Sequence, residues 1–148
     1  MKYHQQLNVL GIQLYSFLEK NKVLFVYLPL TVYWIVIFIL TSIPAESVPT
    51  VGISDKLQHL LAYCVLAMLL YLTLIIQNKF PLLKRNAITF SIIILIGYGV
   101  LDELHQLLIP GRSGEVMDVV ADVVGGIIGL IIVRLIVLNH KAQESVAP

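Results

Sequence analysis

The sequence predicts an all-α membrane protein in which four transmembrane helices form a bundle, and two observations support this prediction. Of the 148 residues, 58% are hydrophobic and only 13% are charged, whereas soluble domains average about 25% charged residues. Four apolar runs are also long enough to cross a bilayer, which requires about 20 residues; they cover roughly residues 23–40, 57–76, 87–109 and 116–138. We therefore expect a membrane domain over residues 23–138, preceded by a segment at 1–22 and followed by a tail at 139–148.

The N-terminal segment, residues 1–22, is predicted to be an amphipathic helix that lies along the membrane surface. Its larger apolar residues recur at helical spacing, as in interfacial helices; they are Leu7, Leu10, Leu14, Phe17 and Leu18. The apolar run after it contains Pro29, which transmembrane helices tolerate better than soluble ones do. Because this run exceeds a typical signal-peptide core and polar residues precede it, we expect no cleaved signal peptide.

The basic residues predict how the helices are oriented. Most of them flank the N-terminal segment, the connection between the second and third runs, and the C-terminal end; they are Lys2, Lys20, Lys22, Lys79, Lys84, Arg85, Arg134 and Lys141. Only Lys56 and Arg112 fall on the opposite side. Since cytoplasmic loops carry the excess of Lys and Arg, we expect both termini to be cytoplasmic. The protein is then a multi-pass protein of the cytoplasmic (plasma) membrane with residues 41–56 and 110–115 facing outward.

The acidic residues gather on the predicted outer side. Seven of the nine fall at or near it: Glu46, Asp55, Asp102, Glu103, Glu115, Asp118 and Asp122. A charge at the centre of a membrane helix costs about 2.5–3.5 kcal/mol, and less near the interface, so several acids at one depth are unfavourable unless they pair, bind a proton or meet water. We therefore predict a polar site at the outer end of the second, third and fourth runs.

Helical spacing indicates which groups meet in this site. Asp55, His59 and Tyr63 share one face, Asp102 shares another with His105 and Gln106, and Asp118 shares a third with Asp122. The candidate binding residues are Asp55, Lys56, His59, Tyr63, Asp102, Glu103, Gln106, Arg112, Asp118 and Asp122. If a reaction occurs, the catalytic candidates are His59, Asp102, Glu103 and His105, with a histidine as base or nucleophile oriented by Asp55 or Asp102.

Glycines in the last two runs predict close helix contacts. Gly125 and Gly129 lie one turn apart below Asp118 and Asp122, and small residues at this spacing let membrane helices approach closely. We expect Gly97 and Gly99 to serve the third run in the same way.

Composition excludes several other functions. The net charge is +1 and the basic residues form no patch, so nucleic acid is not an expected partner. The single cysteine, Cys64, rules out a cysteine-based metal site. No HExxH or comparable spacing occurs, and we expect neither a metal nor another cofactor.

Three stretches carry a resemblance to a known family. They are "SDKLQHLLAYCVLAMLL" at 54–70, "DELHQLLIPGRSGEVMDVVADVVGGIIG" at 102–129 and, more loosely, "TSIP" at 41–44. On these residues the chain resembles the VanZ-like family of small bacterial membrane proteins, over about residues 35–135. The sequence departs from the family pattern at Asp122, where Asn is common.

The resemblance implies a role in the cell envelope. The family is named for a member associated with low-level resistance to the glycopeptide antibiotic teicoplanin, and most members have no assigned reaction. One hypothesis is that the outward site recognises a membrane lipid or a lipid-linked cell-wall precursor. The alternatives are a membrane enzyme that modifies a lipid headgroup and a regulatory subunit whose acids pair with a partner protein or with a second copy of the chain.

Overall fold

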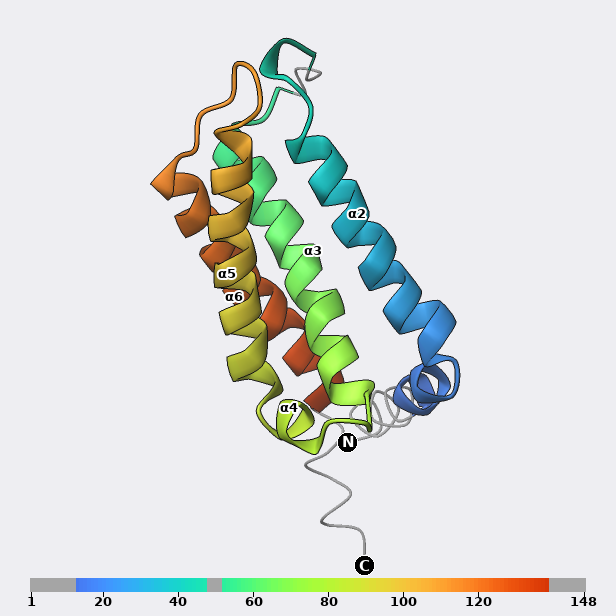
Figure 1. The fold of residues 1–148 in the computed structure, drawn as a ribbon. Coiled ribbons are helices and arrows are strands. Elements are labelled where there is room, and N and C mark those ends of the chain that lie inside the picture. The colour runs from blue at the N-terminus through green and yellow to red at the C-terminus, as the bar shows by residue number, and fades with distance from the viewer. Residues whose placement is uncertain (1–12, 48–51, 139–148) are drawn as a thin grey trace, which may run out of the picture.

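A computed structural model describes residues 13–47 and 52–138, and its four long helices pack into a bundle (Figure 1). These helices are α2 (Leu28–Thr41), α3 (Asp55–Ile76), α5 (Ala87–Gln106) and α6 (Val116–Leu138). Three shorter elements join or extend them: η1 (Val23–Tyr27), η2 (Ala45–Ser47) and α4 (Pro81–Arg85). Four helical stretches are long and apolar enough to cross a membrane, namely Val23–Thr41, Asp55–Ile76, Ala87–Gln106 and Val116–Ile136. The predicted four-helix membrane bundle is confirmed.

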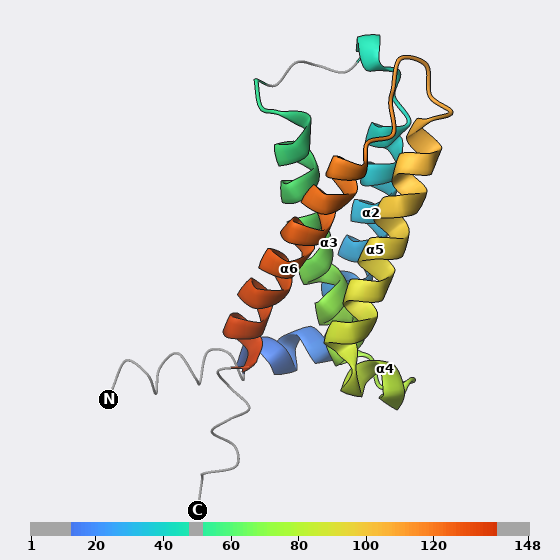
Figure 2. The same ribbon diagram turned by 90° about the vertical axis from the view of Figure 1, so that its left-hand side faces the viewer.

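The first span begins with a turn of π-helix, η1, which runs into α2. The amide of Leu28 donates to the carbonyl of Val23, five residues back. Pro29, which lacks an amide hydrogen, follows at the start of α2. The π-helical turn thus lies directly before the residue that interrupts the regular hydrogen-bond pattern. Residues 13–20 are also helical, and Figure 2 shows this segment crosswise at the foot of the bundle. The rest of the predicted interfacial segment, residues 1–12, and the predicted tail at 139–148 lie outside the described residues, so the position of this segment at the membrane surface stays a prediction.

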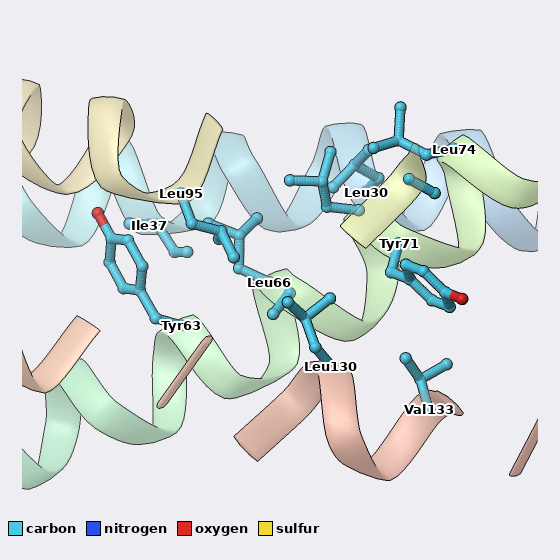
Figure 3. Packing of buried hydrophobic residues seen from close by; sticks show 12 residues of the cluster. Leu30, Ile37, Tyr63, Leu66, Tyr71, Leu74, Leu95, Leu130 and Val133 are labelled. Atoms are coloured by element: carbon cyan, nitrogen blue, oxygen red, sulfur yellow. The ribbon is translucent and has the colours of Figure 1, made fainter. Parts of the chain in front are cut away.

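The helix α3 lies at the centre of the bundle and packs most extensively against α6. Figure 3 shows the apolar contact between them, where Leu66 and Tyr71 of α3 face Leu130 and Val133 of α6. Two glycines make this approach possible. A methyl group on Gly125 would collide with the carbonyl of Leu60, and one on Gly129 with the carbonyl of Cys64. The predicted glycine contact is confirmed.

The glycines of α5 behave differently from each other. A methyl group on Gly99 would lie 2.9 Å from Oδ2 of Asp122, so this position does permit a close approach to α6. The expectation for Gly97 is wrong, because nothing lies within 4 Å of such a methyl group there. The two residues lie two positions apart and thus point about 200° apart around the helix, so only one of them can face a given neighbour.

The two ends of the bundle differ in chemistry. The segments joining α2 to α3 and α5 to α6 lie at one end, which we call the acidic end, and the segment 77–86 lies at the other, the basic end (Figure 1). At the acidic end α5 stops at Gln106, three residues before the predicted boundary at 109. Tight turns replace the helix there: Leu108 donates to His105, Ile109 to Gln106 and Arg112 to Ile109. Gly111 then adopts a φ of +74°, a left-handed conformation that glycine accepts without strain.

Candidate functional site

Four carboxylates from two helices are buried together at the acidic end. Asp102 and Glu103 of α5 are 3% and 7% exposed, and Asp118 and Asp122 of α6 are 2% and 1% exposed. Helix α5 reaches this end with its last turn and α6 starts from it, so the acids that close one helix meet those that open the next. The predicted convergence of acids at one end of the bundle is therefore present in the structure.

His59 of α3 is buried among these acids and joins the three helices. Its Nδ1 atom lies 3.0 Å from Oδ1 of Asp122 and 3.9 Å from Oε1 of Glu103. The helix α3 brings His59 to this depth because Ser54 caps its N-terminus, where the Ser54 hydroxyl accepts a hydrogen bond from the amide of Leu57 at 3.4 Å. The partner of His59 is thus Asp122, and not the Asp55 or Asp102 that sequence spacing suggested.

Glu103 links α5 to the start of α6. Its Oε2 atom accepts a hydrogen bond of 2.7 Å from the backbone amide of Glu115, just before α6 begins. The side-chain amide of Gln106 donates to Glu103 at 3.4 Å and to Asp102 at 3.3 Å. A carboxylate is stabilised near a helix N-terminus, where unpaired amides carry partial positive charge. Gln106 therefore belongs to the polar cluster, as predicted.

Lys56 binds two acids at the rim of the cluster. Its Nζ atom lies 2.7 Å from Glu115 and 3.3 Å from the buried Asp118. The hydrogen bond from Lys56 lowers the pKa of the Glu115 carboxyl, which lies in the loop outside the membrane-spanning segments. About half of each side chain in the Lys56–Glu115 pair is exposed, so the pair is weak and sensitive to salt.

A cavity of about 200 Å³ lies beside the cluster, between α2, α3 and α5. One wall is apolar and includes Ile37 and Leu40 of α2, whereas the opposite wall is polar and includes His59 and Asp102. The full lining is Ile37, Leu40, Thr41, Ile43, Asp55, Gln58, His59, Ala62, Tyr63, Asp102 and Arg112. The predicted stripe of Asp55, His59 and Tyr63 therefore faces a single cavity, whereas Lys56 does not line it.

A second cavity of about 210 Å³ adjoins the first, since Asp55 and Arg112 line both. Arg112 ties the loop at this end to the end of α2. Its Nε donates to the carbonyl of Ile43 and an Nη to that of Leu40, each at 3.2 Å. A hydrogen bond of 3.2 Å from the amide of Ala45 to the carbonyl of Pro110 fixes the same junction.

His105 lies apart from the acidic cluster. Its Nε2 atom is 2.9 Å from the hydroxyl of Ser42, and its ring stacks on Phe38 with centroids 5.0 Å apart. The expectation that it shares a face with Asp102 and Gln106 is wrong for a geometric reason. Residues three and four positions along a helix from Asp102 fall on opposite flanks of it, so that Gln106 is buried with the acids and His105 faces α2.

Sequence reasoning missed several polar groups of this region. Gln58 lines the first cavity one turn after Asp55, a spacing that could have identified it. Ser42 is a further polar group, the partner of His105. Glu115, which belongs to the predicted outer side but not to the candidate binding residues, is the partner of Lys56. The hydroxyl of Tyr63 and Oδ2 of Asp122 are buried without a hydrogen-bond partner among the described residues. The sequence does not predict that these two atoms lack partners.

Some of these side chains have the donor types and spacing of metal ligands. Ligand atoms of His59, Glu103 and Asp122 all lie within 4.8 Å of one another, and so do those of Asp55, His59 and Asp118. Imidazole and carboxylate donors suit several divalent ions. The direct contact of His59 with Asp122 accounts for the same geometry without an ion, and the expectation that the chain binds no metal stays a prediction.

The comparisons with known proteins agree with this architecture. The sequence profile of the VanZ/LLP1 family matches residues 6–137, which include all four spans and every residue of the acidic cluster. No curated protein and no solved structure gives a significant match. The long match, together with four membrane-spanning helices, shows that the chain belongs to the VanZ/LLP1 family.

Proposed function

We propose that the protein recognises the polar headgroup of a lipid-linked cell-envelope molecule at the acidic end, which faces outward from the cytoplasmic membrane. The single observation that carries this proposal is the cavity with unlike walls, apolar on α2 and polar on α3 and α5. A membrane molecule with a polar headgroup and an apolar chain matches such a pair of walls. Binding sites of this kind combine an apolar lining with a few placed polar groups that fix orientation.

The chemistry of the polar wall favours a headgroup rich in hydroxyl or amine donors. Asp55 and Asp102 line the cavity, and ionised carboxylates only accept hydrogen bonds. A sugar or amino-sugar headgroup offers hydrogen-bond donors to these carboxylates.

Arg112 provides the complementary contact for a phosphate. It is the cation that lines both cavities, and its guanidinium has five N–H donors, of which two are used on the carbonyls of Leu40 and Ile43. Lys56 is less suited to this role, because Glu115 and Asp118 already bind it. A lipid-linked cell-wall precursor carries both sugar hydroxyls and phosphate, which is why we propose this class of ligand.

We also propose that such recognition contributes to glycopeptide resistance. A protein that holds cell-wall precursors at the outer leaflet competes with an antibiotic that binds the same molecules. Teicoplanin susceptibility of a bacterial host expressing the wild-type chain, Asp102→Asn or Lys79→Gln tests this. We expect the wild type and the Lys79→Gln control to protect the host and Asp102→Asn to fail. Equal protection by all three would refute a role of the cavity in resistance.

The second candidate function is a membrane enzyme that modifies a lipid headgroup, and the contact of His59 with Asp122 favours it. A carboxylate that accepts a hydrogen bond from one ring nitrogen orients a histidine to act as a base with the other. Comparison of lipids extracted from cells expressing the wild type or His59→Ala separates the two functions. A lipid product found only with the wild type supports the enzyme, whereas identical lipid profiles with lost antibiotic protection support binding alone.

A further inference from the structure

A cavity at the opposite, basic end of the bundle shares no lining residue with the acidic cluster. Its volume is about 410 Å³. It lies where α4 and the first turn of α5 meet the C-terminal parts of α3 and α6. It is lined by Tyr71, Lys84, Arg85, Asn86, Ala87, Ile88, Thr89 and Arg134. Three of these eight residues are cationic and none is acidic, so the cavity has the charge of an anion site.

The three cations form no direct ion pair with a carboxylate of the described residues. The ion pairs found in 13–47 and 52–138 all involve Lys56 or His59. Lys84 instead donates a hydrogen bond of 2.7 Å to the neutral side-chain oxygen of Asn78, whose amide nitrogen in turn donates to Glu19 at 3.1 Å. Like charges that line one cavity repel one another, and a bound anion removes this repulsion.

Neutral donors in the cavity add to the cations. The amides in the first turn of α5 have no intrahelical acceptor, and the N-cap residue Asn86 makes no side-chain hydrogen bond to them. Tyr71 is only 4% exposed, and its hydroxyl has no hydrogen-bond partner among the described residues. Figure 3 shows this hydroxyl pointing away from the labelled leucines of the core. Helix N-termini favour anions through both their free amides and their dipole.

From this convergence we propose that the cavity at the basic end binds the phosphate of an anionic phospholipid. Lys84, Arg85 and Arg134 surround the phosphate, and the first-turn amides of α5 with the Tyr71 hydroxyl donate to its oxygens. The setting identifies a lipid as the source of the phosphate. Phe80 and Leu82, on the same connecting segment, are 52% and 58% exposed, and in a membrane such side chains contact acyl chains. Basic pockets between transmembrane helices suit anionic headgroups.

Native mass spectrometry of the full-length protein in detergent tests this proposal, with phosphatidylglycerol and phosphatidylcholine of the same acyl chains as probes. We expect the wild type to bind phosphatidylglycerol more tightly, and Lys84→Gln or Arg134→Gln each to weaken that binding about fivefold. Lys79→Gln is the matched control, because Lys79 lies over the Phe80 ring at 5.5 Å and does not line the cavity; its binding should equal that of the wild type. Tyr71→Phe should weaken binding without altering the charge.

Three results would overturn the proposal. If Lys84→Gln and Lys79→Gln lost equal affinity for phosphatidylglycerol, the lipid would be held by diffuse surface charge and not by the cavity. Unchanged binding in both Lys84→Gln and Arg134→Gln would exclude the cavity. Binding of inorganic phosphate, with the same dependence on Lys84 and Arg134 but without preference for phosphatidylglycerol, would identify a site for a soluble anion instead. Thermal unfolding of each variant in phosphatidylcholine detects any misfolding, and the Lys84/Lys79 pair remains decisive if Arg134→Gln does not fold. The outcome does not depend on the function proposed for the acidic end.

Discussion

His59 of α3 and Asp122 of α6 are joined by a contact of 3.0 Å between Nδ1 and Oδ1, inside the buried acidic end of the bundle. The contact holds together the two helices that pack most extensively. It also fixes the orientation of the imidazole that lines the cavity. Stability of the fold and geometry of the site therefore depend on the same pair.

Removal of one partner should be far more harmful than a conservative change. We expect Asp122→Ala to lower the free energy of unfolding by about 3 kcal/mol, because it leaves His59 buried without its partner. Asp122→Asn keeps an oxygen acceptor and should cost less than half as much. Reversible unfolding in mixed detergent, followed by circular dichroism, measures both. Equal destabilisation by the two variants would mean that the negative charge of Asp122 matters and the neutral oxygen acceptor does not.

Lys56 should matter more than its exposed partner Glu115. Glu115→Gln removes only a half-exposed ion pair, whereas Lys56→Met also deprives the buried Asp118 of the cation 3.3 Å away. We expect the decrease in melting temperature in detergent to be several times larger for Lys56→Met than for Glu115→Gln. A larger fall for Glu115→Gln would contradict this account.

The pH dependence of the same pair follows from the lowered pKa of Glu115. A carboxyl whose pKa is lower in the folded protein stabilises the fold fully above its ordinary pKa of about 4.3. This stabilisation is lost as the pH falls through the lowered value. The melting temperatures of wild type and Glu115→Gln should therefore differ at neutral pH and converge in acid, and high salt should reduce the neutral-pH difference. A difference that grows in acid would show that the sign is wrong.

The glycines provide a test of the helix packing. Gly129→Ala forces a methyl group against the carbonyl of Cys64, and such overpacking costs about 1–3 kcal/mol. Gly97→Ala is the control, because its methyl group meets nothing within 4 Å and alanine favours a helix over glycine by about 1 kcal/mol. We expect the first variant to unfold more readily than the wild type in detergent titrations and the second to be at least as stable. The opposite order would contradict the α3–α6 contact.

Which end of the bundle faces outward is predicted by the basic residues alone. Cysteines introduced by Ser47→Cys and Ser113→Cys, each in a Cys64→Ala background, should react in intact cells with a membrane-impermeant thiol reagent. Both serines are exposed; Ser47 ends η2 and Ser113 lies between α5 and α6, in the two segments that form the acidic end. Reaction only after lysis would place the acidic cluster in the cytoplasm and remove its access to outer-leaflet molecules.

The sequence predicts the fold well because transmembrane helices are set by local properties. Apolar length locates the spans, and glycine spacing identifies Gly125 and Gly129 as contacts. The meeting of the acids at one end also follows, since alternate helices run in opposite directions. These inferences need only the order of residues along each helix.

The pairing inside the site could not be predicted in the same way. Asp122 is 63 residues from His59, and whether it or Asp102 meets the histidine depends on the rotation of each helix about its axis. The same rotation turns His105 toward Ser42 and Phe38. Packing of all four helices sets these angles, and the spacing within one helix contains no information about them.

The most direct test of the central claim is a measurement of the lipids that remain bound to the purified protein. Wild type, Asp102→Asn and Lys79→Gln, extracted from bacterial membranes in mild detergent, would be analysed by mass spectrometry for lipid-linked cell-wall precursor. We predict that wild type and Lys79→Gln retain the precursor, that Asp102→Asn loses it, and that all three retain anionic phospholipid. Equal retention of the precursor by all three, or its absence from the wild type, would contradict recognition by the cavity at the acidic end.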